Sequence, residues 1–108
     1  MAVITGTRMF NTSIDIQADA RRELVDMLNQ QLADVITLHS QTKQAHWNVK
    51  GERFFQLHEL YDELANDIFG YIDDTAERVT ALGGTALGTT ELAANATTLP
   101  AYPLENIS

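Results

Sequence analysis

The distribution of hydrophobic and polar residues along the chain predicts two long helices. In two segments, apolar side chains recur at steps of three and four, which is the spacing of one helix face. The first segment runs from about Ala18 to Val49, and the second runs from about Arg53 to Leu82. We expect one stripe from each segment to pack against the other. The first stripe comprises Leu24, Leu28, Leu32, Val35, His39, Thr42 and His46, and the second comprises Leu57, Tyr61, Leu64, Ile68, Ile72, Thr75, Val79 and Leu82.

Glycine and proline residues mark the ends of these segments. Gly51 is placed to end the first helix in the left-handed conformation, and the glycines at 83–84 close the second helix. The tight turn between the two segments predicts an antiparallel helical hairpin. Beyond the hairpin there is room for one short helix, from about Thr90 to Asn95, before the two prolines of the chain favour an extended connection.

Length and composition restrict the class of protein. A chain of 108 residues forms at most one small domain. No run approaches the roughly 18 apolar residues that a membrane span needs, and the N-terminus lacks a signal-peptide pattern, so we expect a cytoplasmic protein. The chain has no cysteine, so any metal must bind to nitrogen and oxygen. A formal net charge of −8 repels nucleic-acid phosphates and attracts cations.

A second face of the predicted 53–82 helix carries candidate metal ligands. At 100° per residue, His58, Asp62, Asp73 and Glu77 fall within an arc of about 100°, roughly 140° from the apolar stripe. Asp62 and Asp73 are about 16 Å apart along the helix axis, so one ion cannot contact both. The pairs 58/77 and 62/73 nevertheless share one midpoint, between residues 67 and 68. Two copies crossing antiparallel about a two-fold axis at this midpoint would form two identical mixed sites.

His46 can join each of these mixed sites. It precedes the turn at Gly51 by about as many residues as His58 follows it, so the antiparallel hairpin places both imidazoles roughly 8 to 10 Å from the turn. Two imidazoles and three carboxylates suit ferrous iron, manganese or zinc rather than magnesium or calcium, although ligand type alone does not select iron. Gly70 is consistent with a close crossing, because an interior helix glycine costs about 1 kcal/mol relative to alanine.

The segment HELYD at 58–62 also resembles the zinc-protease pattern H-E-x-x-H. Asp62 stands where that pattern has its second histidine. In a zinc protease, Glu59 would be the general base, and a third ligand would come from elsewhere in the chain. This interpretation leaves the remaining candidate ligands without a role.

Three segments of the chain together form a specific pattern: AHWNVKG at 45–51, LHELYDEL at 57–64 and DDTAERVTALGGTALGT at 73–89. They resemble the corresponding segments of Dps proteins, the mini-ferritins named as DNA-binding proteins from starved cells. The resemblance covers about Leu24 to Pro103. It implies an all-α fold, a ferritin-like four-helix bundle of which this chain supplies the first two long helices and the connecting loop. It also implies a hollow twelve-subunit cage that oxidises Fe(II), preferably with hydrogen peroxide, stores the ferric mineral and protects against oxidative damage.

The resemblance also assigns roles to individual residues. Residue types and spacings match the family's ferroxidase ligands at five positions: His46, His58, Asp62, Asp73 and Glu77. It implies that the first three come from one subunit and the last two from its two-fold mate. Trp47 resembles a family tryptophan near the iron that takes up oxidising equivalents, with simple packing as the alternative role. His39 matches no family ligand, and we interpret it as a core or interface histidine.

The resemblance ends where the family's third long helix begins. We expect residues 1–17 to form a flexible leader and residues 18–108 to form the ferritin-like domain, which is incomplete at its C-terminus. Two long helices with apolar stripes cannot enclose a core alone. The chain is therefore expected to be a fragment, half of a split protein whose second chain carries the missing helices, or a two-helix subunit that dimerises. A helical assembly module with an inactive metal site is the alternative function.

Basic residues are scarce in both tails of the sequence. The first 17 residues contain one basic residue, Arg8, and the C-terminal tail contains none. Because few phosphate contacts are available, we do not expect tight DNA binding at physiological salt.

Overall fold

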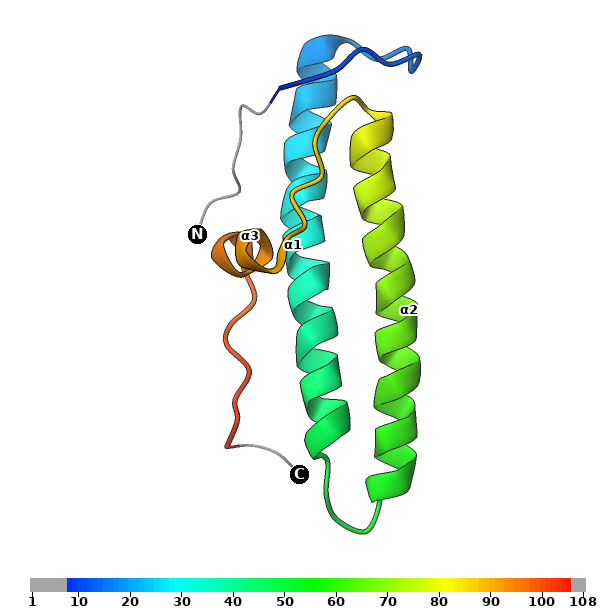
Figure 1. Ribbon diagram of the computed structural model, residues 1–108, viewed down its shortest axis with the longest axis vertical. Coiled ribbons are helices and arrows are strands. Elements are labelled where there is room, and N and C mark those ends of the chain that lie inside the picture. Colours follow the sequence, from blue (N-terminus) through cyan, green and yellow to red (C-terminus); the bar gives the residue numbers. More distant parts are fainter. Residues whose placement is uncertain (1–7, 106–108) are drawn as a thin grey trace.

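The computed structural model describes residues 8–105, which form two long antiparallel helices and one short helix. Helix α1 spans Ala18–Asn48, α2 spans Phe54–Ala81 and α3 spans Thr90–Ala96. Figure 1 shows α1 and α2 side by side, with α3 lying across α1 on the side away from α2. The predicted all-α fold is confirmed, and each predicted helix boundary lies within one residue of the observed one.

A Schellman motif ends α2 at the two glycines predicted to close it. Gly83 has a φ of 88°, and its N–H donates to the carbonyl of Thr80 over 3.0 Å. The N–H of Gly84 donates to the carbonyl of Val79, also over 3.0 Å. These two bonds satisfy carbonyls that the last helical turn leaves free.

Gly51 adopts the predicted left-handed conformation, with a φ of 103°. It lies within the turn rather than directly at the helix end, because α1 stops at Asn48 and Val49 is already extended. The carbonyl of Gly51 accepts a hydrogen bond from the N–H of Phe54, which opens α2. The hairpin turn therefore fixes the start of α2 relative to the end of α1.

The hydrophobic core follows the contact between α1 and α2 and continues beneath α3. One buried cluster consists of Val25, Val79 and Leu82, and another consists of Ala33, Ala93 and Ala96. The prediction that Leu24 and Leu64 are buried in the contact between the two helices is wrong, because Leu24 is 37% exposed and Leu64 is 42% exposed. Ala65, one residue after Leu64, is buried instead. The two helices meet on the side of α2 that carries this small residue, which leaves Leu64 at the edge of the contact.

Polar side chains of α1 form hydrogen bonds with the segment that follows α2. Asn29 is 1% exposed; its amide donates to the carbonyl of Thr85 and its oxygen accepts from the N–H of Leu87, both over 3.0 Å. The carboxylate of Asp34 accepts from the hydroxyl of Thr97 over 2.9 Å, and from the N–H and hydroxyl of Thr98 over 2.7 and 2.9 Å. Burial raises the pKa of Asp34, but these hydrogen bonds outweigh burial and lower it.

The described part of the N-terminal segment contacts the end of α2. The N–H of Phe10 donates to the carbonyl of Gly83 over 2.7 Å, and the hydroxyl of Thr12 donates to the carbonyl of Ala81 over 2.8 Å. The guanidinium of Arg21 donates to the carbonyls of Phe10, Ile16 and Leu82. Residues 1–7, the remainder of the predicted leader, lie outside the described residues.

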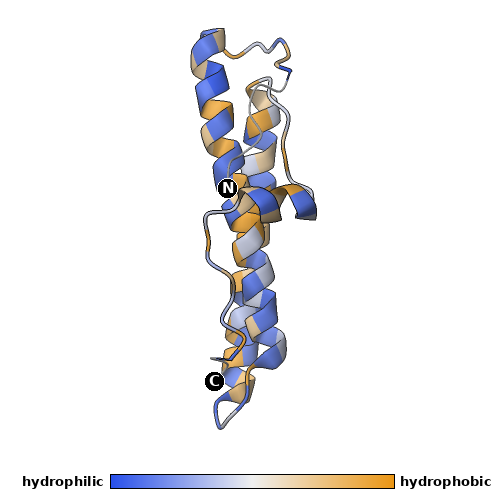
Figure 2. Cartoon of the chain, turned by 90° about the vertical axis from the view of Figure 1, so that its left-hand side faces the viewer, coloured by the Kyte–Doolittle hydropathy of each residue, from blue (hydrophilic) through white to orange (hydrophobic). Residues whose placement is uncertain are grey.

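Large apolar side chains remain exposed on this hairpin. Figure 2 shows hydrophobic residues, in orange, interspersed with hydrophilic ones along both long helices. On one side, Leu38 and Leu64 border a groove of about 290 Å³ that Tyr61 and Tyr102 also line. On another side of α2, Phe55 is 66% exposed and Phe69 is 55% exposed. In the described range, no helix has the length and apolar character needed to cross a membrane.

Candidate metal centre

Two histidines face each other where the long helices approach the hairpin turn. His46 lies in the last turn of α1 and His58 in the first turns of α2. Their rings stack with centroids 3.7 Å apart, and the ring of Phe54 also stacks with His58, with centroids 5.2 Å apart. The antiparallel hairpin therefore brings the two imidazoles together at the level that the sequence predicts. His46 is 9% exposed, so much of this stack is shielded from solvent.

Reciprocal hydrogen bonds orient both imidazoles. Nδ1 of His46 lies 2.6 Å from the carbonyl oxygen of His58, and Nδ1 of His58 lies 2.8 Å from the carbonyl oxygen of His46. A carbonyl oxygen only accepts, so each Nδ1 must carry the hydrogen. In the neutral ring, the lone pair is then on Nε2, which is the state of a metal-binding histidine whose other nitrogen donates to a carbonyl.

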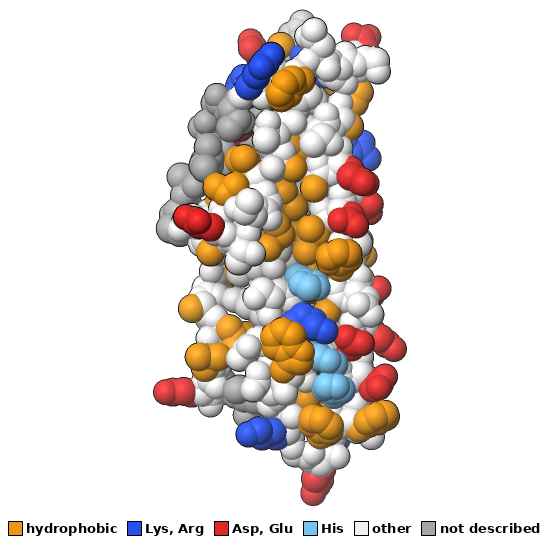
Figure 3. Space-filling model, viewed as in Figure 1, with side chains coloured by type: hydrophobic (Ala, Val, Ile, Leu, Met, Phe, Trp, Pro, Cys, Tyr) orange, Lys and Arg blue, Asp and Glu red, His pale blue; other side chains and the backbone are white. Residues whose placement is uncertain are grey.

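The carboxylate of Asp62 lies beside the histidine pair. Its Oδ1 is 3.9 Å from Nε2 of His46 and 3.2 Å from Nζ of Lys43. The side chain of Asp62 is 48% exposed, so this edge of the cluster is open to solvent. Figure 3 shows the histidines and a basic side chain in one row on a single face of the hairpin, with acidic side chains along its edge. Lys43 thus supplies a positive charge at the position where a bound cation would contact Asp62.

The other two predicted ligands do not join this cluster within one chain. Asp73 and Glu77 are exposed and follow Asp62 by three and four turns of α2, so they are about 16 Å or more from it along the axis. Within residues 8–105, no three histidine or acidic side chains converge closely enough to hold a metal ion. Within one chain, the two groups of predicted ligands therefore lie at two different heights along the hairpin.

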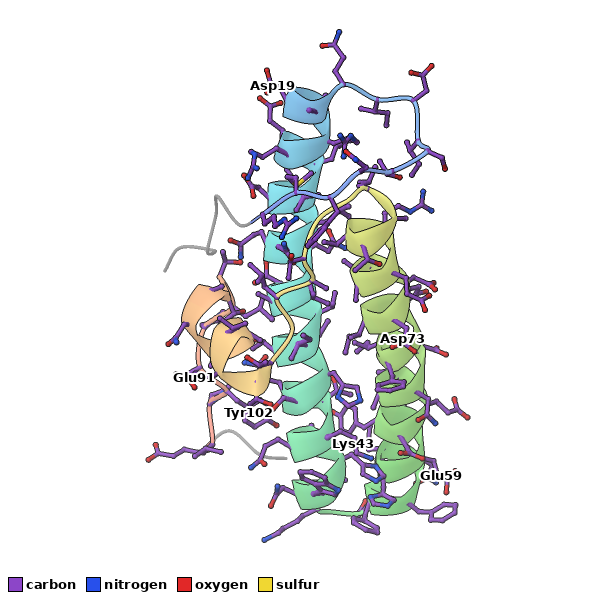
Figure 4. All side chains as sticks on the ribbon, turned by 45° about the horizontal axis from the view of Figure 1, so that its top comes forward. Asp19, Lys43, Glu59, Asp73, Glu91 and Tyr102 are labelled. Atoms are coloured by element: carbon purple, nitrogen blue, oxygen red, sulfur yellow. The ribbon has the colours of Figure 1, made fainter. Side chains whose placement is uncertain are left out.

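The remaining sequence candidates lie around this cluster. Trp47 is 64% exposed, and Nζ of Lys43 is 5.7 Å from its ring centroid. His39 lies nearer the N-terminus of α1 than His46, and its ring centroid is 5.8 Å from that of Phe69. Figure 4 shows Lys43 between the long helices, whereas Glu59 lies on the side of α2 away from α1. A general base at Glu59, as the zinc-protease interpretation needs, would therefore act away from His46.

Comparison with known proteins identifies the family. A model of the ferritin-like domain matches residues 25–105. The DNA protection during starvation protein of Agrobacterium fabrum is 44% identical over 94 residues, which make up 87% of this chain and 58% of that protein. The chain belongs to the Dps family of ferritin-like proteins.

Solved Dps structures share this arrangement of helices. DpsC from Streptomyces coelicolor is 38% identical, with a TM-score of 0.85 over 88% of this chain and 55% of that one. A structure of Dps from Listeria innocua soaked with zinc is 30% identical, with a TM-score of 0.71 over 74% of this chain and 55% of that one. The chain thus spans little more than half the length of these Dps relatives.

Sequence reasoning missed Lys43, whose Nζ lies 3.2 Å from Oδ1 of Asp62 and so is closer to it than Nε2 of His46, at 3.9 Å. The position of Lys43 could have been predicted from its spacing, because it precedes His46 by three residues and therefore lies on the same face of the helix. A lysine on a predicted metal-binding face is easily read as a solvated charge. Lysine is also not among the ligand types that the Dps resemblance implies.

Proposed function

We propose that this chain provides the ferroxidase site of a Dps mini-ferritin. In this proposal, Fe(II) is the substrate and hydrogen peroxide is the oxidant. Nε2 of His46, Nε2 of His58 and the carboxylate of Asp62 bind iron from one subunit. Asp73 and Glu77 of a second copy complete the site across a two-fold interface. Zinc or manganese can substitute for iron because imidazole nitrogens and carboxylate oxygens bind all three metals.

The observation that carries the proposal is the reciprocal orientation of the two histidines. Each Nδ1 is occupied by the carbonyl of the other residue, so both Nε2 atoms are free to bind a metal. Two histidines that merely filled space would not need this pairing. The carboxylate of Asp62 beside His46 adds the negative charge that a divalent cation requires. The incomplete ligand set of a single chain supports a site shared between subunits.

The chemistry requires the protein to hold iron while electrons pass to peroxide. Two Fe(II) ions each lose one electron, the O–O bond of one peroxide breaks, and two protons from solvent complete two water molecules. Delivering both electrons to one peroxide avoids the hydroxyl radical that a single-electron step would release. The carboxylates favour the ferric product, because a hard trivalent ion prefers oxygen ligands. Ferric ions then leave the site and accumulate as stored mineral.

The wider assembly is part of the same proposal. The exposed side chains of Leu38 and Leu64 fit a bundle that further helices complete, carried either by the rest of the protein or by a second chain. Twelve such subunits would enclose the mineral in a cytoplasmic cage. Protection of DNA, which the name of the Agrobacterium relative states for that protein, would follow here from removing iron and peroxide rather than from tight DNA binding.

A pair of neighbouring substitutions tests the proposal in the assembled protein. Asp62→Ala removes a ligand and should slow peroxide-dependent Fe(II) oxidation by at least about tenfold, as loss of a ligand or of its support commonly does. Glu59→Ala alters an exposed carboxylate of the same helix and should leave the rate unchanged. Stopped-flow absorbance of ferric ion, with peroxide or oxygen as the oxidant, measures both. Equal rates for Asp62→Ala and wild type would refute the assigned site.

A helical assembly module with an inactive metal site is the second candidate. The contact between Lys43 and Asp62 favours it, because an internal ammonium already neutralises the carboxylate over 3.2 Å. If that pair excludes cations, zinc or ferrous iron will not bind, and the oligomer will form equally well with and without metal. Metal binding by equilibrium dialysis therefore separates the two candidates.

A further inference from the structure

The helix face that carries the candidate ligands also carries an exposed aromatic ring near its centre. At 100° per residue, Phe69 falls within the arc between His58 and Glu77. Its side chain is 55% exposed. Within the chain, its ring lies against His39 of α1, with centroids 5.8 Å apart and planes inclined by 50°. Burying the exposed half of this aromatic side chain against a second surface would be energetically favourable.

The register of the hairpin places this aromatic pair at the level of the proposed two-fold axis. His46 lies level with His58, and Val25 packs with Val79 in the same antiparallel register. By that register, His39 lies level with about residue 65 of α2, and Phe69 lies one turn beyond. The ligand pairs 58/77 and 62/73 have their midpoint between residues 67 and 68. Phe69 is therefore only about 2 Å along the helix from the axis level.

Gly70 provides a second, independent observation at this level. A glycine inside a helix costs about 1 kcal/mol relative to alanine. Its φ is not positive, and a Cβ added at Gly70 would meet no atom within 4 Å. Neither backbone conformation nor crowding within the described chain therefore requires glycine. Close approach of another helix would require it.

We propose that Phe69 of each subunit lies beside the two-fold axis of the shared site and packs against Phe69 of the second copy. Each Phe69 then lies about 4.5 Å along the helix from its copy. Helices in contact have axes 8–10 Å apart, so the two rings come within the roughly 4.5–7 Å that aromatic pairs prefer. His39 of each copy flanks this contact and completes a cluster of four rings. The cluster holds together the two halves of each iron site without contacting iron.

This inference rests on the proposed function, because the axis position comes from the ligand pairs. It adds residues that bind no metal and yet determine whether the shared site forms. The partner is another copy of this chain, because the ligand pairs 58/77 and 62/73 share one midpoint and can therefore meet across a two-fold axis at that level.

Single-cysteine crosslinking tests the ring cluster directly, because the chain has no native cysteine. Phe69→Cys places a thiol beside the proposed axis, whereas Asp67→Cys places one at the same level on the opposite side of α2. With a short bismaleimide crosslinker, the assembled Phe69→Cys protein should give predominantly crosslinked dimers on a denaturing gel. The Asp67→Cys protein should remain monomeric on that gel. Equal crosslinking of the two variants, or none at Phe69→Cys, would overturn the cluster.

Two further variants separate docking from folding. Phe69→Lys should weaken the dimer at least about 30-fold in sedimentation equilibrium, as loss of a central interface anchor does. Phe69→Leu should retain most of the affinity, and far-UV circular dichroism should be unchanged for both because this side chain is half exposed. A wild-type dimer affinity for Phe69→Lys would refute the inference. In that case, a variant with His58→Ala and Asp62→Ala could be reassembled with a variant carrying Asp73→Ala and Glu77→Ala. If the mixture restored iron oxidation, the shared iron site would stand and only the contribution of Phe69 to the interface would be wrong.

Discussion

Replacing Lys43 by glutamine should increase the affinity of the candidate site for divalent cations. Nζ of Lys43 is 3.2 Å from Oδ1 of Asp62, so a binding cation must displace the ammonium or tolerate its repulsion. At this distance, two unit charges in water interact by about 1.3 kcal/mol. The side chain of Asp62 is 48% exposed, and exposed pairs measure about 0–1 kcal/mol, so we take about 1 kcal/mol as the contribution.

A change of about 1 kcal/mol corresponds to roughly fivefold tighter binding. Isothermal titration of the assembled protein with zinc measures this directly and avoids oxidation during the experiment. Lys50→Gln is the matched control, because it removes the same charge from an exposed position in the hairpin turn. The affinity of Lys43→Gln should exceed that of Lys50→Gln and of the wild type. Unchanged or weaker zinc binding in Lys43→Gln would show that the ammonium does not compete for Asp62.

Two further predictions concern the C-terminal segment and nucleic acid. Asp34→Asn should lower the free energy of unfolding by about 1 kcal/mol at pH 7, since the charged acceptor of the Thr97 and Thr98 hydrogen bonds is lost. Because the pKa of Asp34 is depressed below 3.8 in the folded chain, this difference should persist above about pH 5 and vanish as the pH falls through the folded pKa, as urea titrations can show. In a gel-shift assay at about 150 mM salt, duplex DNA should not be retained at submicromolar protein, and retention would contradict the charge-based expectation.

The helices and half of the candidate site were predictable because they depend on local sequence signals. Apolar spacing and glycine positions determine the helices within one residue, and the length of the turn at Gly51 sets His46 level with His58. The exposure of Leu64 was not predictable, because an apolar stripe does not show which of its residues lies at the edge of a contact. The burial of Asn29 was missed for a related reason, since it depends on carbonyl and amide groups far along the chain.

The shared part of the site stays a prediction. Asp73 and Glu77 are exposed in the single chain, and only their spacing relative to His58 and Asp62 indicates a partner. The spacing of residues on one helix indicates which of them can meet across a two-fold axis. It does not supply the energy of the interface, which depends on packing between two chains.

Complementation between two ligand variants tests the shared iron site most directly. One variant carries His58→Ala and Asp62→Ala, and the other carries Asp73→Ala and Glu77→Ala, so each alone should be nearly inactive in Fe(II) oxidation. In a mixed dimer, one site combines both altered halves and the other combines both intact halves. Dissociating the two variants and reassembling them together should therefore restore oxidation toward about half the wild-type rate per mixed dimer. No recovery, when native mass spectrometry shows that mixed dimers have formed, would contradict a site built from both subunits.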